Sequence, residues 1–172
     1  MQQLYLTGIH AASIAEKLFH ALNVRPTGYQ LMPFTVGGGV RGEALHLLTP
    51  PCGPMDNDVP CRIRLRTGDW TIIPRVLDEI AAPTLLQART LHTPILLGGV
   101  TGTMLTCRAF REAVVACLQG DCPVIVAASD DAEDILRALT EEADQMWMPV
   151  PEGADGQAAL LEELIAEAAL RL

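Results

Sequence analysis

The stretch LYLTGIHAASIAEKLFHAL, residues 4–22, joins a short apolar run to an amphipathic segment through a glycine. The run at residues 4–7 consists of residue types that favour strands, and Gly8 ends it. From Ser13 to Leu22 the apolar residues recur at helical spacing. The stretch therefore predicts a strand that enters a helix through a glycine turn, which is the basic unit of an α/β sheet.

The same alternation of strand and helix patterns continues to the end of the chain. Two extended runs at 28–36 and 41–50 flank three consecutive glycines at 37–39, which predicts a hairpin inserted in the N-terminal half. We expect a three-layer α/β fold with a mainly parallel central sheet, formed by one domain over residues 1–172. The remaining strands are expected at 60–66, 93–99, 122–129 and 145–150, and the remaining helices at 74–88, 107–118, 131–143 and 155–172.

Prolines and charges add detail to three of these segments. Pro74 suits the first turn of the helix that it begins, and Pro83 predicts a kink in that helix. Basic residues alternate with apolar ones in 60–66, which is typical of an edge or half-exposed strand. Prolines and a glycine in 49–58 predict a loop with an exposed tip, and the sequence assigns no role to the Pro- and Cys-bearing segment 49–61.

The composition argues against several classes of function. With 172 residues, 49% of them hydrophobic, the chain is long enough to bury a substantial core. The formal net charge of −9 and the pI near 4.8 argue against nucleic acid or an anionic membrane as a partner, because both need clustered Lys and Arg. We find no signal-peptide pattern and no apolar run long enough to span a bilayer, so we expect a cytoplasmic protein.

Cysteine and histidine spacing does not predict a metal site or a disulfide framework. The number of cysteines is odd, and none of them forms a Cys-x-x-Cys pair. The histidines are scattered over different predicted elements. A metal or redox protein that uses Cys52, Cys61 and the Met-rich stretches is the weakest of the alternatives that we consider. The cysteines are Cys52, Cys61, Cys107, Cys117 and Cys122, and the histidines are His10, His20, His46 and His92.

Five segments together carry a resemblance to a known family. They are LYLTG (4–8), GYQLMPFTVGGGVRGEALHL (28–47), GDWTIIPRVLDEIAAPTLLQA (68–88), ILLGGVTGTMLTCRAFREAV (95–114) and DCPVIVAAS (121–129). In order and spacing they resemble segments of the thermophile-type, or cancer-related, nucleoside-triphosphatases, which are small P-loop proteins. The resemblance covers nearly the whole chain and implies a P-loop NTPase-like fold. It also implies where the residues of a nucleotide site would stand.

The resemblance places the family's phosphate loop at residues 8–15. Such a loop reads Gly, four residues, Gly-Lys and Ser or Thr; its amides cradle phosphates, the lysine neutralises them and the hydroxyl binds magnesium. Here Ser13, Ile14 and Ala15 stand at the last three positions, and neither isoleucine nor alanine supplies the missing groups. We expect contact with a nucleotide, if any, at this degenerate phosphate-loop position: Gly8, His10, Ala11, Ala12, Ser13, Ile14 and Ala15.

Three further positions of the family's site lack its functional groups. Gly98 and Gly99 stand where the family has the Asp-Glu pair that holds magnesium through water and orients the attacking water. The His-Arg pair after the late strand corresponds to Ser129-Asp130, and Asp131 follows. The Thr and Glu of the family's hairpin correspond to apolar residues, Leu31 and Met32. These losses predict that the hydrolytic chemistry is gone.

Other candidate motifs are weaker. Asp78-Glu79 in VLDEI (76–80) imitates an acidic motif, but the pair falls in a predicted helix and is assigned to the surface. The stretch GGVTGT (98–103) follows a strand but lacks both the GxGxxG spacing and a basic residue. Neither Ser13 nor Ser129 has hydrolase-like partners, and Cys107 at a predicted helix start has no identifiable base.

These observations lead to two functional hypotheses. The first is a catalytically degenerate nucleoside-triphosphatase-like protein with a binding, scaffold or regulatory role and an unidentified protein partner. It has no catalytic residues and no metal ligands, and magnesium is not expected. The alternative is a nucleotide-binding protein or weak nucleoside-triphosphatase that holds a nucleotide, or a phosphate or sulfate anion, through loop amides at the start of the first helix.

Overall fold

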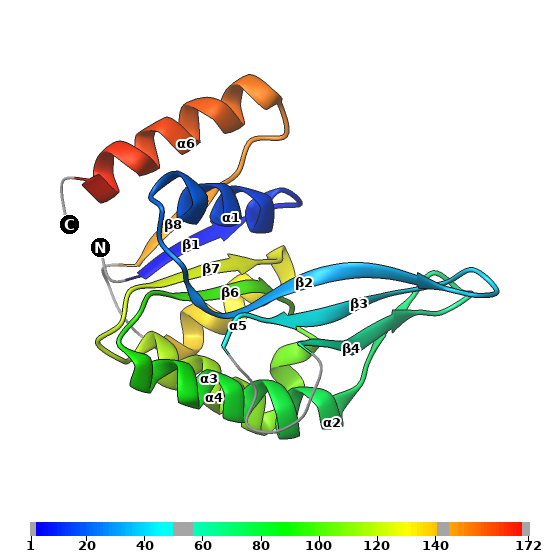
Figure 1. Cartoon of the computed structure of the whole chain (residues 1–172). Coiled ribbons are helices and arrows are strands. Elements are labelled where there is room, and N and C mark those ends of the chain that lie inside the picture. Colours follow the sequence, from blue (N-terminus) through cyan, green and yellow to red (C-terminus); the bar gives the residue numbers. More distant parts are fainter. Residues whose placement is uncertain (1–2, 50–56, 141–144, 170–172) are drawn as a thin grey trace.

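A computed structural model of the protein describes residues 3–49, 57–140 and 145–169. The described residues form an eight-stranded sheet with helices on both faces (Figure 1). The strands are β1 (Gln3–Thr7), β2 (Thr27–Val36), β3 (Val40–Leu47), β4 (Asp58–Arg64), β5 (Trp70–Ile72), β6 (Ile95–Val100), β7 (Val124–Ala128) and β8 (Met146–Pro149). The α-helices are α1 (Ala11–Ala21), α2 (Pro74–Val76), α3 (Ala82–Ala88), α4 (Arg108–Leu118), α5 (Asp130–Thr140) and α6 (Ala154–Ala169).

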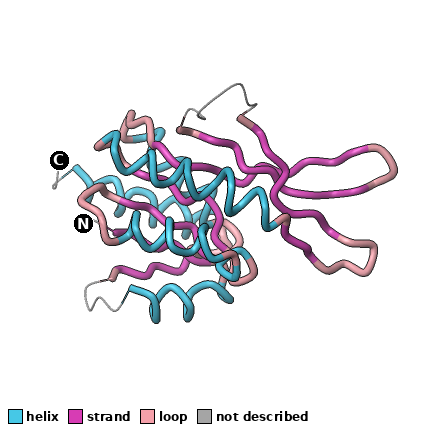
Figure 2. The backbone as a smooth tube through the Cα atoms, turned by 90° about the horizontal axis from the view of Figure 1, so that it is seen from below, coloured by secondary structure: helices cyan, strands magenta, loops and turns pink. Residues whose placement is uncertain are grey.

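The sheet has a parallel part and an antiparallel part. Its strand order is β5-β4-β3-β2-β6-β7-β1-β8. In this order, the pairs β2–β6, β6–β7, β7–β1 and β1–β8 are parallel. Strands β2 to β5 pair antiparallel in sequence order and extend away from the helices (Figure 2). We call these four strands the arm. The predicted α/β class, the mainly parallel sheet and the inserted hairpin are confirmed.

The two faces of the sheet pack against different helices, which gives the three expected layers. Helices α1 and α6 cover one face, and α3, α4 and α5 cover the other (Figure 1). Leu4 and Leu6 of β1 pack in the cluster that holds α1 and α6, whereas Tyr5 between them belongs to the cluster on the opposite face. This alternation follows from the two-residue period of a strand. Because β1 is buried on both faces, it reads as a continuous apolar run.

The helix predicted at 74–88 forms in three parts with a wide turn in the middle. A π-helical turn at Leu77–Ala81 separates α2 from α3, and the N–H of Ala82 donates to the carbonyl of Leu77. Pro83 has no N–H, and in a regular α-helix its ring would clash with the carbonyl four residues earlier. The wide turn before Pro83 therefore accommodates the proline, and the predicted irregularity takes this form.

Other element boundaries differ from the predictions. The strand predicted at 60–66 begins at Asp58 and lies inside the sheet, because β5 pairs with it and takes the edge. The sequence did not predict β5, which has three residues and no buried side chain. Most of the predicted loop 49–58, with Cys52, and the predicted helical residues 141–143 lie outside the described residues. Within the described part of the chain, no helix is long and apolar enough to cross a membrane.

Gly28 joins the arm to the parallel part of the sheet. It pairs with Leu96 of β6, has a φ of +98°, and donates its N–H to the buried hydroxyl oxygen of Thr49 at 2.9 Å. A Cβ atom at this position would overlap the carbonyl oxygen of Leu96. The close approach of β2 to β6 at this point therefore requires glycine.

Gly28→Ala is expected to lower the free energy of unfolding by roughly 2 kcal/mol or more, from backbone overlap and positive-φ strain together. Urea denaturation measures the change. Gly37→Ala is the matched control, because no atom lies within 4 Å of its added Cβ and its φ is not positive. Equal stability of the two variants would contradict the assigned role of Gly28.

Candidate functional site

The carboxyl ends of the parallel strands β1, β6 and β7 meet at one edge of the sheet, beside the base of the arm. A cavity of about 200 Å³ lies there. Ligands of open α/β sheets bind at this edge. The residues that line the cavity come from the loop after β1, from the first turn of α1, from β2, β3 and β4, and from the ends of β6 and β7. They are Gly8, Ile9, Ala11, Ala12, Leu31, Glu43, Arg62, Gly98, Gly99, Val100, Thr101, Ala127, Ala128 and Ser129.

The loop after β1 is a tight turn rather than a long phosphate loop. Helix α1 begins at Ala11, two residues before the predicted start, and the N–H of Ala11 donates to the carbonyl of Gly8 at 3.1 Å. Only Ile9 and His10 lie between these two residues. No backbone carbonyl of the described residues accepts from the N–H groups of Ala12 and Ser13, which belong to the first turn of α1. The turn thus leaves two N–H groups without a backbone acceptor at the start of α1.

The predicted phosphate-loop residues separate into two groups. Gly8, Ala11 and Ala12 line the cavity. Ile14 and Ala15, at the positions of the family's lysine and hydroxyl, are 1% and 0% exposed in the cluster between α1 and the sheet. They contribute to the core and not to the cavity.

The two polar residues of the predicted loop also lie outside the cavity lining. His10 precedes α1 but makes no side-chain capping hydrogen bond. Ser13 lines a separate hollow of about 510 Å³ at α1, together with Leu161 of α6. Three of the seven residues thus line the cavity, and contact of this loop with a nucleotide stays a prediction.

Gly98 and Gly99 form an irregular end of β6 against β2. The β6–β7 register shifts between Leu97 and Val100. A Cβ atom added to Gly98 would lie 2.7 Å from the carbonyl oxygen of Tyr29. Gly99 has a φ of +146°, and a Cβ there would overlap the Leu31 side chain. At the positions of the acidic pair in the resembling family, a side chain at 98 would therefore meet backbone, and one at 99 would strain the chain and displace Leu31.

Tyr29 holds this glycine pair in place. Its side chain is 1% exposed, and its hydroxyl donates to the carbonyl of Gly99 at 2.9 Å. Burial raises the pKa of Tyr29 well above its ordinary value, so the phenol stays protonated and keeps donating. The bulge at the end of β6 is therefore fixed from the β2 side.

The end of β7 is tied to the loop after β6 by Asp131. The Asp131 carboxylate accepts from the N–H of Gly102 at 3.1 Å and from the Ser129 hydroxyl. The Ser129 hydroxyl also lies 3.1 Å from the carbonyl of Val100. Ser129 and Asp130 stand at the positions of the His-Arg pair of the resembling family, and the Ser129 hydroxyl contacts the carboxylate of Asp131. Negative charge at this place repels phosphate.

The sequence did not identify the charged pair that lines the cavity. Nε of Arg62 on β4 lies 2.5 Å from a carboxylate oxygen of Glu43 on β3, and the two side chains are 17% and 23% exposed. The Arg62 guanidinium also stacks over the ring of Trp70, 4.5 Å from its centroid. Glu43 and Arg62 are cross-strand partners, so the pairing of β3 with β4 creates the contact. The contact can therefore be predicted only when the register of β3 with β4 is known.

The acidic pair Asp78-Glu79 does not reach the cavity, but its predicted surface role is half wrong. Glu79 is exposed and pairs with Arg75 one helical turn away. Asp78 is half-buried, and its carboxylate accepts from the N–H of Phe110 at 3.0 Å. Phe110 lies in the first turn of α4, so Asp78 caps that helix from a neighbouring one.

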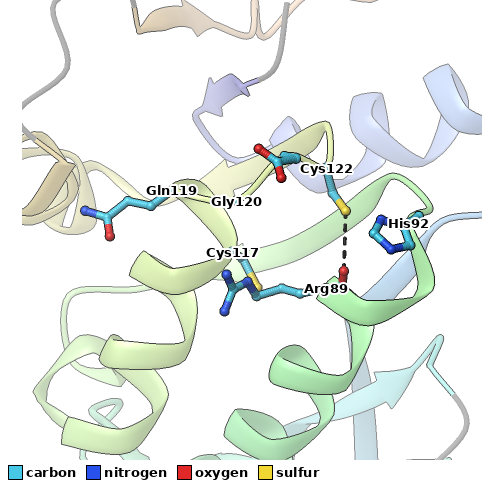
Figure 3. A pocket seen from close by; sticks show the side chains of 7 residues that line it. Arg89, His92, Cys117, Gln119, Gly120 and Cys122 are labelled. Atoms are coloured by element: carbon cyan, nitrogen blue, oxygen red, sulfur yellow. Dashed lines mark hydrogen bonds between the residues drawn. The ribbon is translucent and has the colours of Figure 1, made fainter.

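A second cavity, of about 160 Å³, lies at the opposite edge, before β6 and β7 begin. Figure 3 shows Cys117, Cys122, His92 and Arg89 around it. The Cys122 thiol donates to the carbonyl of Arg89 at 3.7 Å, and the Cys117 thiol donates to the carbonyl of Leu85 at 3.6 Å. Burial raises the pKa of Cys117 to about 12, which keeps the thiol protonated.

No cluster of three or more metal-ligating side chains occurs in the described part of the chain. Cys61, which the metal or redox alternative required, is buried and donates its thiol to the carbonyl of Glu43 at 3.3 Å. Burial raises the pKa of Cys61 to about 12. The four described cysteines, Cys61, Cys107, Cys117 and Cys122, are free thiols.

Comparison with known proteins supports the fold. The structure is similar to that of THEP1 from the hyperthermophile Aquifex aeolicus, with a TM-score of 0.69 and 13% sequence identity over 95% of this chain and 97% of that chain. The chain therefore has the P-loop NTPase-like fold that the resemblance implied. No protein-family model matches the chain, and no curated protein sequence matches it.

Introducing an acidic side chain at the end of β6 is expected to destabilise the protein. Gly98→Asp should lower the free energy of unfolding by roughly 2 kcal/mol or more, because its Cβ meets the backbone of β2. The matched control is Ala12→Asp, which adds the same side chain at an exposed cavity position in the first turn of α1, where an acid is tolerated. Urea denaturation compares the two, and an unaltered Gly98→Asp protein would contradict the geometry.

The Cys117 thiol is expected to resist alkylation in the native protein. Burial raises its pKa to about 12, so at pH 8 far less thiolate is present than in an ordinary thiol. Mass spectrometry after iodoacetamide treatment at pH 8 should find Cys117 unmodified in buffer and modified in concentrated urea. Equal labelling of Cys117 in both conditions would show that the thiol is accessible and ionised.

Proposed function

We propose that this chain is a catalytically degenerate nucleoside-triphosphatase-like protein with a binding or regulatory role in the cytoplasm. The observation that carries the proposal is the lining of the cavity at the carboxyl edge of the sheet. Backbone, small side chains and apolar side chains make up most of it, and Glu43 is the one carboxylate among the described lining residues. That carboxylate is already paired with Arg62.

The chemistry of phosphoryl transfer explains why this lining matters. Hydrolysis of a triphosphate depends on a magnesium ion, on cations that neutralise the transferred phosphate and on a group that orients water. Magnesium takes hard oxygen ligands in near-octahedral geometry. In this chain the equivalent of the magnesium-binding hydroxyl is Ala15 in the core, and the glycines at 98 and 99 carry no carboxylates. We therefore assign binding, and not turnover, to this site.

The loop at the mouth of the cavity supports a role in contact with another molecule. Ile9 lines the cavity and is 83% exposed, the highest value among the exposed large apolar side chains. A molecule that covered this side chain would remove its apolar surface from water, which favours binding. We place the unidentified protein partner of this proposal at this loop.

A second candidate is a nucleotide-binding protein or weak nucleoside-triphosphatase. The Glu43–Arg62 pair favours it, because the cavity then contains one cation and one carboxylate beside the first turn of α1. A ligand phosphate that displaces Glu43 from Arg62 would free that carboxylate to accept a proton from water. This route needs no lysine in the loop.

Phosphate release and thermal stability separate the two candidates. The purified chain is incubated with ATP or GTP and magnesium, and inorganic phosphate and the melting temperature are measured. The degenerate protein should release no phosphate above the uncatalysed background, and any ligand that binds at a hundred times its Kd should stabilise it by about 2.7 kcal/mol. Magnesium-dependent release that is lost in Glu43→Gln would establish the second candidate.

Ile14→Lys is expected not to restore hydrolysis, although it restores the residue type of the phosphate loop. Ile14 is 1% exposed in the core, so the ammonium group would be buried away from the cavity. The variant should melt well below the parent and release no phosphate. Ser13→Lys, at an exposed position one residue earlier, is the control for the added charge. Recovered turnover in Ile14→Lys would show that the loop can reorganise into a phosphate site.

A further inference from the structure

Two arginines face each other across the arm. Arg41 of β3 is the register partner of Arg64 of β4, and both residues are exposed. Like charges directly opposite one another destabilise an antiparallel pair. Neither arginine forms an ion pair with a described residue; Arg64 donates Nε–H to the carbonyl of Gly68 at 3.1 Å. The folding of the arm therefore gains nothing from this placement.

The arginine pair lies on the same face of the arm as the cavity. Glu43 and Arg62, which line the cavity, pair two residues along the same strands from Arg41 and Arg64. Residues two apart in a strand share a face, and the two rungs are separated by roughly 7 Å at about 3.3 Å per residue. A positively charged surface thus continues outward from the mouth of the cavity.

Trp70 adds an aromatic ring to this surface. It is the register partner of Arg64 on β5, it is 40% exposed, and its ring lies under the Arg62 guanidinium. Arg62 thus lies between Trp70 on β5 and the carboxylate of Glu43 on β3. The face therefore carries three guanidinium groups and one carboxylate, Glu43, within two rungs of β3 and β4. This local balance is opposite in sign to the net charge of −9 of the chain.

The size of the cavity fits a ligand that extends onto the arm. Sites that enclose a whole small-molecule ligand measure roughly 300–1,000 Å³, whereas this cavity measures about 200 Å³. It accommodates one part of such a ligand, and the rest must lie outside. The nearest polar surface on the β3–β4 side is the Arg41–Arg64 rung.

We propose that Arg41 and Arg64 bind the phosphate group of a phosphorylated small molecule whose other end enters the cavity. This inference rests on the proposed binding function and names the ligand class and the residues that hold it. A phosphate carries up to two negative charges and accepts the forked hydrogen bonds of guanidinium groups, so one phosphate satisfies two facing arginines. A carboxylate carries only one negative charge and would neutralise only one of the two arginines. The phosphate binds on the arm and not at the tight turn after β1.

Calorimetric titration with pyrophosphate and with ADP, in EDTA, tests the proposal. Both probes should bind the parent protein saturably. Arg41→Gln/Arg64→Gln should weaken that binding at least tenfold, because two charge-assisted contacts are lost. Arg108→Gln is the matched control: this exposed arginine lies on α4 and pairs with Glu112, and its loss should leave the affinity within threefold of the parent. Without ligand, the double variant should melt at or slightly above the temperature of the parent.

The outcomes separate this inference from the proposed function. Unchanged affinity in Arg41→Gln/Arg64→Gln, an equal loss in Arg108→Gln, or no saturable binding of either probe to the parent overturns the inference. Weakened binding only in the double variant supports it, even if phosphate release shows that the protein hydrolyses nucleotides. Adenosine without phosphate should fail to compete with ADP, and full competition by adenosine would also overturn the assignment of the phosphate to the arm.

Discussion

The close packing of the β6 backbone against β2 is the constraint on which the arm and the cavity both depend. Gly28 allows β2 to approach Leu96, and Gly98 lies against the backbone of Tyr29 and Gln30 two rungs further along. Side chains at these positions would push the strands apart. The arm is therefore fixed to the parallel sheet at an angle that brings β3 and β4 beside the carboxyl edge (Figure 1). Gly98 also leaves the end of β6 without an acidic side chain.

The fold and the chemistry of a phosphate site are separable here. The strand order and the helix after β1 remain, because they depend on apolar burial: Ile14 and Ala15 pack as well in the core as any residues of α1. The catalytic groups of such a site are single side chains at strand and helix ends, and they contribute little to folding. The loop after β1 is a tight turn, and the charged side chains that line the cavity come from the arm.

Local patterns were sufficient to predict most of the fold and part of the site. Apolar periodicity identified the strands β1, β6 and β7 and the helix α4, and the three glycines identified the hairpin. The resemblance identified Gly8, Gly98 and Ser129, which the structure brings to one cavity. The register of β3 with β4 is a long-range property that no local pattern encodes, so Glu43–Arg62 and Arg41–Arg64 were not foreseen. The role of Asp78 was missed for a similar reason, since its partner lies 32 residues away.

The central claim is that this protein builds no magnesium site at the carboxyl edge of its sheet. The most direct test is the affinity of ADP measured by calorimetry in magnesium and in EDTA. A protein that holds a phosphate only through arginines should bind free ADP at least as tightly as its magnesium complex, because the ion neutralises charge that the guanidinium groups attract. Binding that is at least tenfold tighter in magnesium would contradict the claim.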